Sequence, residues 1–129
     1  MSKLANLEKI SADPAAGSEI IFTADEDMIV HSLVFQLITD ATVANRTPTI
    51  LADDGNDVFF RASAGVQTAS VAQTYCAFAG SAFQAASTVL FAFPATGLRL
   101  RKGDRLRTST NTLQAGDNYG PMVMQVERI

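Results

Sequence analysis

Short runs rich in Val, Ile, Thr, Phe and Tyr recur along the chain, separated by Gly, Pro, Asn and Asp. Apolar and polar positions alternate within most runs, which is typical of β-strands, and the separating residues are typical of turns. About eight or nine strands with a turn every ~8–12 residues predict an all-β fold, an antiparallel β-sandwich with jelly-roll-like connectivity. The predicted strands are 19–23, 28–39, 47–52, 58–62, 66–79, 88–93, 98–100, 105–110 and 122–128.

The longest run, 28–39, is apolar at both odd and even positions. A central strand covered on both sides shows this pattern, and so does a strand whose outer side is covered by a neighbouring subunit. Its β-branched and aromatic residues favour a strand over a helix. The segment 81–86 consists mainly of small residues, and there a strand and a short helical turn both remain open.

Two Gly-containing turns, 53–57 and 101–104, lie between short apolar runs, and each predicts a β-hairpin. Residues 14–129 are predicted to form a single domain. Residues 1–13, which Pro14 and Gly17 set apart, are predicted to be an N-terminal arm that docks on a partner. The predicted core includes Ile21, Ile29 or Val30, Leu33, Phe35, Leu37, Tyr75, Leu90, Leu100, Leu106 and Val123.

Half of the basic residues gather around the second turn. Leu98, Leu100 and Leu106 occupy the opposite side of the same predicted hairpin, so one side is apolar and the other basic. Two interpretations remain open: a basic ribbon that binds an acidic protein surface, and a solvated outer side that protects a sheet edge. The candidate partner-binding residues are Arg99, Arg101, Lys102, Arg105 and Arg107.

Composition excludes most catalytic and metal sites. The 129 residues have a formal net charge of -3, which argues against a generic nucleic-acid binder. With Cys76 and His31 as the single residues of their types, one chain cannot form an internal disulfide, a Cys-based zinc site or a His-rich metal centre. No secretory signal and no run near the ~18 apolar residues of a membrane span is present. We therefore expect a non-enzymatic protein made in the cytoplasm, without cofactor, metal, nucleic acid or membrane.

Individual polar residues support this expectation. The acidic turn 53–57 carries four Asx side chains, but the twelfth position of an EF-hand starting at Asp53 is Ala64 instead of Glu, so a metal-free turn is predicted. His31 lies within an apolar run and is expected to be a hydrogen-bonded core or interface residue. Cys76 is expected to be a buried, reduced side chain.

Charge is nearly absent from the middle of the chain. Between residues 58 and 99 the single charged residue before Arg99 is Arg61, and Ala, Ser, Thr and Gly are abundant. A free monomer rarely exposes so much uncharged surface, so this part of the chain predicts an interface and a homo-oligomer.

Three segments, 37–46, 97–104 and 113–118, resemble small virion proteins of tailed bacteriophages. The first reads Leu-Ile-Thr-Asp-Ala-Thr-Val-Ala-Asn-Arg, and the second is a leucine strand that ends in Lys-Gly-Asp. The resemblance extends from about Ile21 onwards and implies a jelly-roll-like capsid decoration or cement protein. The implied location is the outside of the capsid, and the implied partners are the major capsid protein or another virion protein and further copies of the chain, with a trimer favoured. The Asn45-Arg46 pair is expected to cap the turn after the long strand.

Other functions remain open beside this one. A head-fibre, neck or tail accessory protein would share the resemblance. A carbohydrate- or receptor-binding module needs exposed aromatic platforms, for which Tyr75 and Tyr119 are candidates. An enzyme of the cupin or nuclease type is disfavoured because the chain lacks the required His and acidic clusters.

Overall fold

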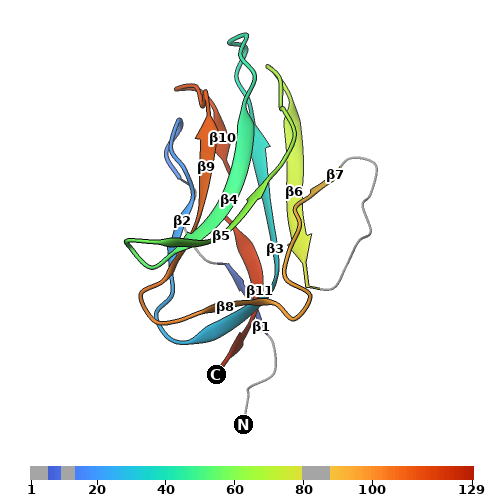
Figure 1. Cartoon of the computed structure of the whole chain (residues 1–129). Helices are drawn as coiled ribbons and strands as arrows, with labels where there is room; N and C mark the ends of the chain where they lie inside the picture. Colours follow the sequence, from blue (N-terminus) through green and yellow to red (C-terminus); the bar gives the residue numbers. More distant parts are fainter. Residues whose placement is uncertain (1–5, 10–13, 80–87) are drawn as a thin grey trace.

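The computed structural model describes residues 6–9, 14–79 and 88–129. These residues contain eleven strands and no helix, and the strands form two sheets that pack face to face around one core (Figure 1). The predicted fold, an all-β, jelly-roll-like sandwich, is confirmed. The chain crosses repeatedly between the two sheets, and every strand pair except β6–β7 is antiparallel.

The larger sheet, sheet A, is organised around the long strand β3 (Met28–Ile38). Because β8 and β11 pair with the same residues of β3, they lie on opposite edges of it; β6 and β10 are opposed in the same way. Around β3 lie β1 (Asn6–Lys9), β11 (Val123–Arg128), β6 (Ala72–Phe78), β7 (Thr88–Leu90), β8 (Leu98–Leu100) and β10 (Asn118–Tyr119). Sheet B has the order β2 (Ile21–Thr23), β9 (Arg105–Asn111), β4 (Thr47–Asp53), β5 (Val58–Ser63).

A β-bulge explains much of the two-sided apolar pattern of β3. The register with β11 shifts where Gln125 pairs Ser32 and Val126 pairs Val30, which leaves one extra residue on β3. The side chains that point into the core are therefore Met28 and Val30 before the bulge and odd-numbered residues after it. The sequence analysis offered two explanations for this pattern, burial on both sides and cover by a neighbouring subunit. The structure adds a third: the bulge changes which positions of the strand face the core.

The core contains a cluster of aromatic rings from sheet A and its flanking loops. Phe35 stacks on Tyr75 and Phe91, and Tyr119 meets it edge-on. The core predictions for Val30, Leu33, Phe35, Leu37, Tyr75, Leu100 and Leu106 are confirmed.

Three core predictions were wrong by one position. Ile21 is 56% exposed, and its neighbour Ile20 is buried instead. Leu90 and Val123 are partly exposed, and the buried residues beside them are Phe91, Met122 and Met124. Each error lies near the end of a strand with apolar residues at adjacent positions, so alternation did not fix which one faces inward.

Of the two hairpins predicted from Gly-containing turns, one is confirmed and one is wrong. The turn 53–57 joins β4 to β5, which pair as predicted. The turn 101–104 does not join a hairpin, because β8 pairs with β3 in sheet A whereas β9 pairs with β2 and β4 in sheet B. The leucines of both strands still face the core, since the inner sides of the two sheets meet there.

Two more segments differ from the sequence-based expectation. Within the region predicted to be an N-terminal arm, Asn6–Lys9 forms strand β1 at the edge of sheet A, paired with β11. The short strand β10 lies at Asn118–Tyr119, where none of the predicted strands was placed. Segment 81–86, with its open choice of strand or helical turn, lies outside the described residues.

Candidate functional site

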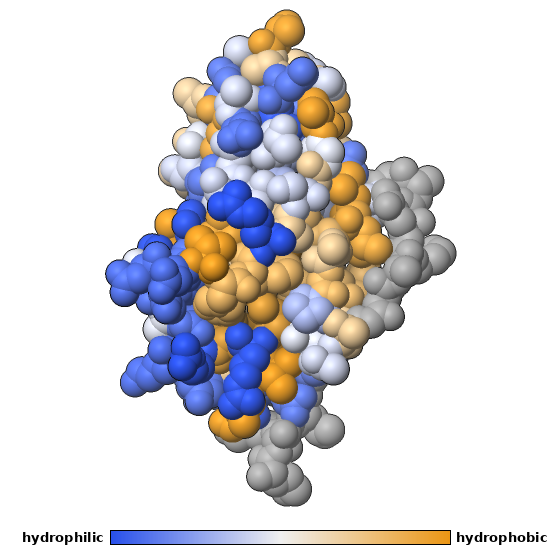
Figure 2. Space-filling view, in the orientation of Figure 1, coloured by the Kyte–Doolittle hydropathy of each residue, from blue (hydrophilic) through white to orange (hydrophobic). Residues whose placement is uncertain are grey.

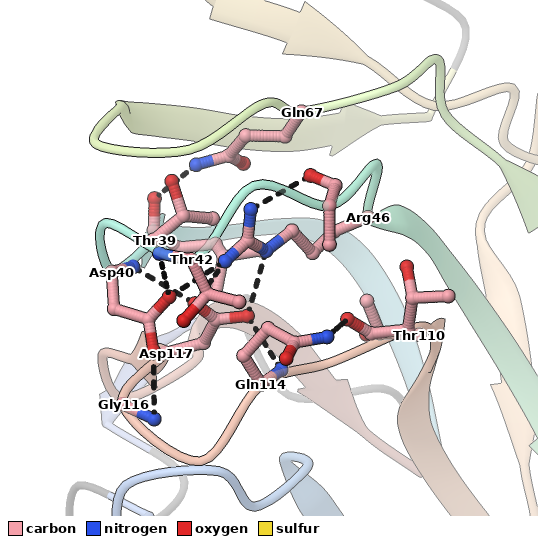
Figure 3. Close-up of polar contacts among 12 residues, drawn as sticks. Thr39, Asp40, Thr42, Arg46, Gln67, Thr110, Gln114, Gly116 and Asp117 are labelled. Carbon is pink, nitrogen blue, oxygen red and sulfur yellow. Dashed lines mark hydrogen bonds and ion pairs between the residues drawn. The ribbon is translucent and has the colours of Figure 1, made fainter.

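A buried arginine joins two loops at one end of the sandwich. Arg46 is 0% exposed, and its Nε and Nη2 donate to the two carboxylate oxygens of Asp117 at 2.9 and 3.1 Å. Nη2 also donates to Asp40 Oδ1 at 2.8 Å, and Nη1 donates to the Ala44 carbonyl at 2.7 Å (Figure 3). We call Arg46, Asp40 and Asp117 the Arg46 network.

Backbone amides complete this network. Asp117 accepts hydrogen bonds from the amides of Asp40 and Gln114, and Asp40 accepts one from the Gly116 amide. Burial by itself raises the pKa of Asp117, but the hydrogen bonds from Arg46, Gln114 and Asp40 outweigh it, and the pKa is lowered. The carboxylate is thus charged at neutral pH, and it ties the β3–β4 loop to the β9–β10 loop.

The Arg46 network gives a structural role to two segments of the phage-protein resemblance. Segments 37–46 and 113–118 meet at it. The sequence predicted a turn-capping role for Asn45 and Arg46, and the bond to Ala44 fits it, but the pairing with Asp117 was missed. A signal was present: each of these two charges stands alone in a long uncharged stretch, between Asp40 and Asp53 for Arg46 and between Arg107 and Glu127 for Asp117.

The five candidate partner-binding residues fall into two groups. Arg105 and Arg107 lie on β9, where the Nε of each donates to a different carboxylate oxygen of Asp53 at 2.8 Å. Asp53 is itself buried on the outer side of β4. These two arginines are therefore held within sheet B and form no free ribbon with Arg99 and Arg101.

Hydrogen bonds from Arg107 and Arg105 lower the pKa of Asp53 from 3.8 to about 2. A lowered folded-state pKa means that this carboxylate stabilises the fold above its unfolded pKa and that the contribution is lost as pH falls towards about 2. We expect the free energy of unfolding to decrease as pH falls from 3.8 to about 2, and to decrease less in the Asp53→Asn variant. Urea titrations at a series of pH values measure both curves. Equal acid sensitivity of the two proteins would contradict this role of Asp53.

The other group lies beside a pocket of about 340 Å³. Arg99 is on β8, Arg101 and Lys102 are in the turn after it, and all three are exposed. Arg99 and Arg101 line the pocket, together with Phe59 of β5 and the acidic residues Asp54, Asp57 and Asp104. Figure 2 shows strongly hydrophilic and hydrophobic surface side by side on the lower part of the molecule, where Figure 1 places β8 and the β4–β5 turn.

The outer side of sheet A has a different character. Val34 and Ile38 project outward from β3 and are 38% and 49% exposed. Pairing places only uncharged residues around them on β6, β7, β10 and β11. We call this surface the uncharged face; it comprises Ser32, Val34, Gln36, Ile38, Ala72, Thr74, Phe78, Thr88, Leu90, Asn118, Val123 and Gln125. Cys76 points to the same side of the sheet but is buried. The charges on the outer side of sheet A lie beyond this face, at Arg99 and Glu127, which both pair with Ile29. The outer side of sheet B carries Asp53, Arg61, Arg105 and Arg107.

The remaining candidate residues have structural partners. Asp54 Oδ1 accepts the amides of Asn56 and Asp57, as predicted for an Asx-stabilised turn. His31 Nε2 lies 2.9 Å from Glu127 Oε1, and Cys76 is buried. Over the described ranges, no group of three or more His, Cys, Asp or Glu side chains is arranged to hold a metal ion. None of the described segments is a helix of the length and apolarity required to span a membrane.

No family model and no curated protein sequence matches the chain. Among solved structures, the chain is similar to PfGH50B at 12% identity and a TM-score of 0.44, over 99% of this chain but 22% of that one. It is also similar to the Eiger TNF of S. frugiperda at 9% identity and a TM-score of 0.41, over 98% of this chain and 94% of that one. Likenesses at this level carry no functional argument, so function has to be argued from the surfaces described above.

Proposed function

We propose that this chain is a non-enzymatic structural protein of a phage particle, a decoration or cement protein that stabilises the capsid shell through subunit–subunit contacts. The observation that carries the proposal is the uncharged face, with Val34 and Ile38 exposed near its centre. Contiguous uncharged surface of this kind is uncommon on monomers and is typical of protein–protein interfaces. The resemblance of segments 37–46, 97–104 and 113–118 to small virion proteins supports the same class.

A second copy of the chain is the partner that best suits the uncharged face. The described residues of this face offer no charge with which an oppositely charged surface could pair, whereas another copy presents the same apolar and neutral polar groups. On the opposite side of the sandwich, sheet B carries charges, among them Arg105 and Arg107, which pair with Asp53. A homotrimer is favoured, because capsids have threefold positions at which such a protein can sit, next to the major capsid protein.

Self-association can be tested with one substitution in the centre of the uncharged face. We expect the full chain to be a trimer by light scattering at micromolar concentration, and Val34→Lys to be a monomer because the new charge would be desolvated in the interface. Ile38→Lys, at a more exposed position of the same strand, is a second variant. Ile21→Lys is the matched control, since Ile21 is an exposed apolar residue on a strand of sheet B. A monomeric wild-type chain, or trimers of both face variants, would overturn the role of this face.

The particle assignment needs a separate measurement. The particles encoded with this chain are purified by sedimentation, and the number of copies of the chain per copy of the major capsid protein is determined. For a decoration protein we expect a fixed, stoichiometric number of copies of the chain per copy of the major capsid protein. Absence from the particles would overturn the proposal, and a few copies per particle would replace it with a neck, fibre or tail component.

A further inference from the structure

The pocket between β8 and the β4–β5 turn contains charged side chains that the fold does not use. Neither Arg99 nor Arg101 forms an ion pair or side-chain hydrogen bond with any residue that the structure describes. Arg105 and Arg107, a few positions further along, are by contrast both held by Asp53. The two free guanidinium groups therefore leave their donors available to a ligand.

The pocket lining also includes acceptors. Asp54 and Asp104 already accept backbone amides with one oxygen each, from the Asn56–Asp57 turn and from Arg101. Hydrogen bonds from the Asp57 and Asn56 amides, with the charge of Arg101 as a smaller cause, lower the pKa of Asp54, so it is ionised. The Asp57 carboxylate has no side-chain partner among the described residues. The pocket thus offers donors and acceptors at once.

An aromatic ring completes the lining. Phe59 is 48% exposed, although most aromatic side chains of the described chain contribute to the core. Its ring gives the pocket an apolar wall next to the charged groups. Tyr75 and Tyr119, which the sequence left open as aromatic platforms, are both buried, so neither can serve as one.

We propose that this pocket binds a neutral saccharide, whose hydroxyl groups bridge Arg99 and Arg101 to Asp57 and whose ring packs on Phe59. A hydroxyl both donates and accepts hydrogen bonds, which matches a pocket lined by arginine and aspartate residues. An anion would meet three carboxylates, and a purely apolar ligand would leave the charged groups desolvated without partners. The volume lies near the lower end of the ~300–1,000 Å³ usual for ligand pockets, which suits a short saccharide.

The test is an amide chemical-shift titration of the full isotope-labelled chain by nuclear magnetic resonance. The probes are methyl glucoside, methyl galactoside, N-acetylglucosamine, lactose, cellobiose and inorganic phosphate. We expect at least one saccharide to shift amides within 54–59 and 99–104 with a Kd of about 1 mM, and raised salt to leave this Kd nearly unchanged. Phe59→Ala and Arg99→Ala are each expected to weaken binding by about tenfold or more, a loss of about 1.4 kcal/mol.

Arg61→Ala is the matched control, because Arg61 is an exposed arginine of β5 outside the pocket lining. Its titration is expected to match that of the wild type. No response to any of the saccharides, or a response that survives both pocket substitutions, would overturn the proposal. Salt-sensitive binding of phosphate in place of saccharide would also overturn it and identify an anion site. The inference does not rest on self-association, since the pocket residues lie outside the uncharged face.

Discussion

Replacement of Asp117 by Asn is expected to lower the free energy of unfolding by about 3–5 kcal/mol. The substitution keeps the shape of the side chain but leaves the buried guanidinium of Arg46 with the partly exposed Asp40 as its remaining carboxylate partner. A buried guanidinium that loses its fully buried partner is costly because no water replaces the lost interaction. A single domain is stable by only ~5–15 kcal/mol, so this loss is a large fraction of the total. Chemical denaturation followed by circular dichroism measures it.

Asp25→Asn is the control for this prediction. Asp25 also pairs with an arginine, Arg128, but its side chain is 74% exposed, and water screens the interaction. We expect this variant to unfold at nearly the wild-type denaturant concentration. If both variants lost the same stability, burial of the Arg46 network would not be the cause.

Truncation of Phe35 to Ala is expected to cost about 3–5 kcal/mol of stability. The Phe35 ring contacts three other rings, with centroid distances of 5.4 Å to Tyr75, 6.0 Å to Phe91 and 5.6 Å to Tyr119. Removal of the ring loses its transfer free energy and leaves a cavity that these neighbours, held on different segments, cannot close completely. The measurement is equilibrium unfolding in urea.

Phe59→Ala provides the comparison for Phe35→Ala. The same atoms are removed, but Phe59 is half exposed, so the change in buried area is much smaller. We expect this variant to retain most of the wild-type stability, which also makes it suitable for the saccharide titration. Similar destabilisation by the two substitutions would show that Phe35 is not the centre of the core.

Local sequence patterns determined the class of fold. Alternation in β-branched and aromatic runs located β3, β4, β5, β8 and β9 to within one or two residues. The Asx-rich turn after β4 identified the hairpin that it closes, because turn chemistry acts over neighbouring residues. Properties that depend on a few adjacent positions could therefore be derived from the chain alone.

Pairing partners were decided by the tertiary structure. The segment 98–107 reads as a hairpin, yet β8 joins sheet A and β9 joins sheet B, because in a sandwich both sheets bury leucines on their inner sides. The same local pattern fits either sheet, and what selects between them is the hydrogen bonding of distant strands. The supposed basic ribbon was divided for this reason, with Arg105 and Arg107 held by Asp53.

The sites also depend on contacts between residues far apart in the sequence. The sequence showed Arg46 and Asp117 as isolated charges, but only folding brings them together, across 71 positions, into a buried pair. The pocket likewise combines Phe59 with Arg99 and Arg101 from another part of the chain. The sequence by itself determined that the chain has one His and one Cys and that Arg61 is the single charged residue between 58 and 98. The fold decided where the charged residues meet, since a charge is stabilised or left free by its neighbours in space.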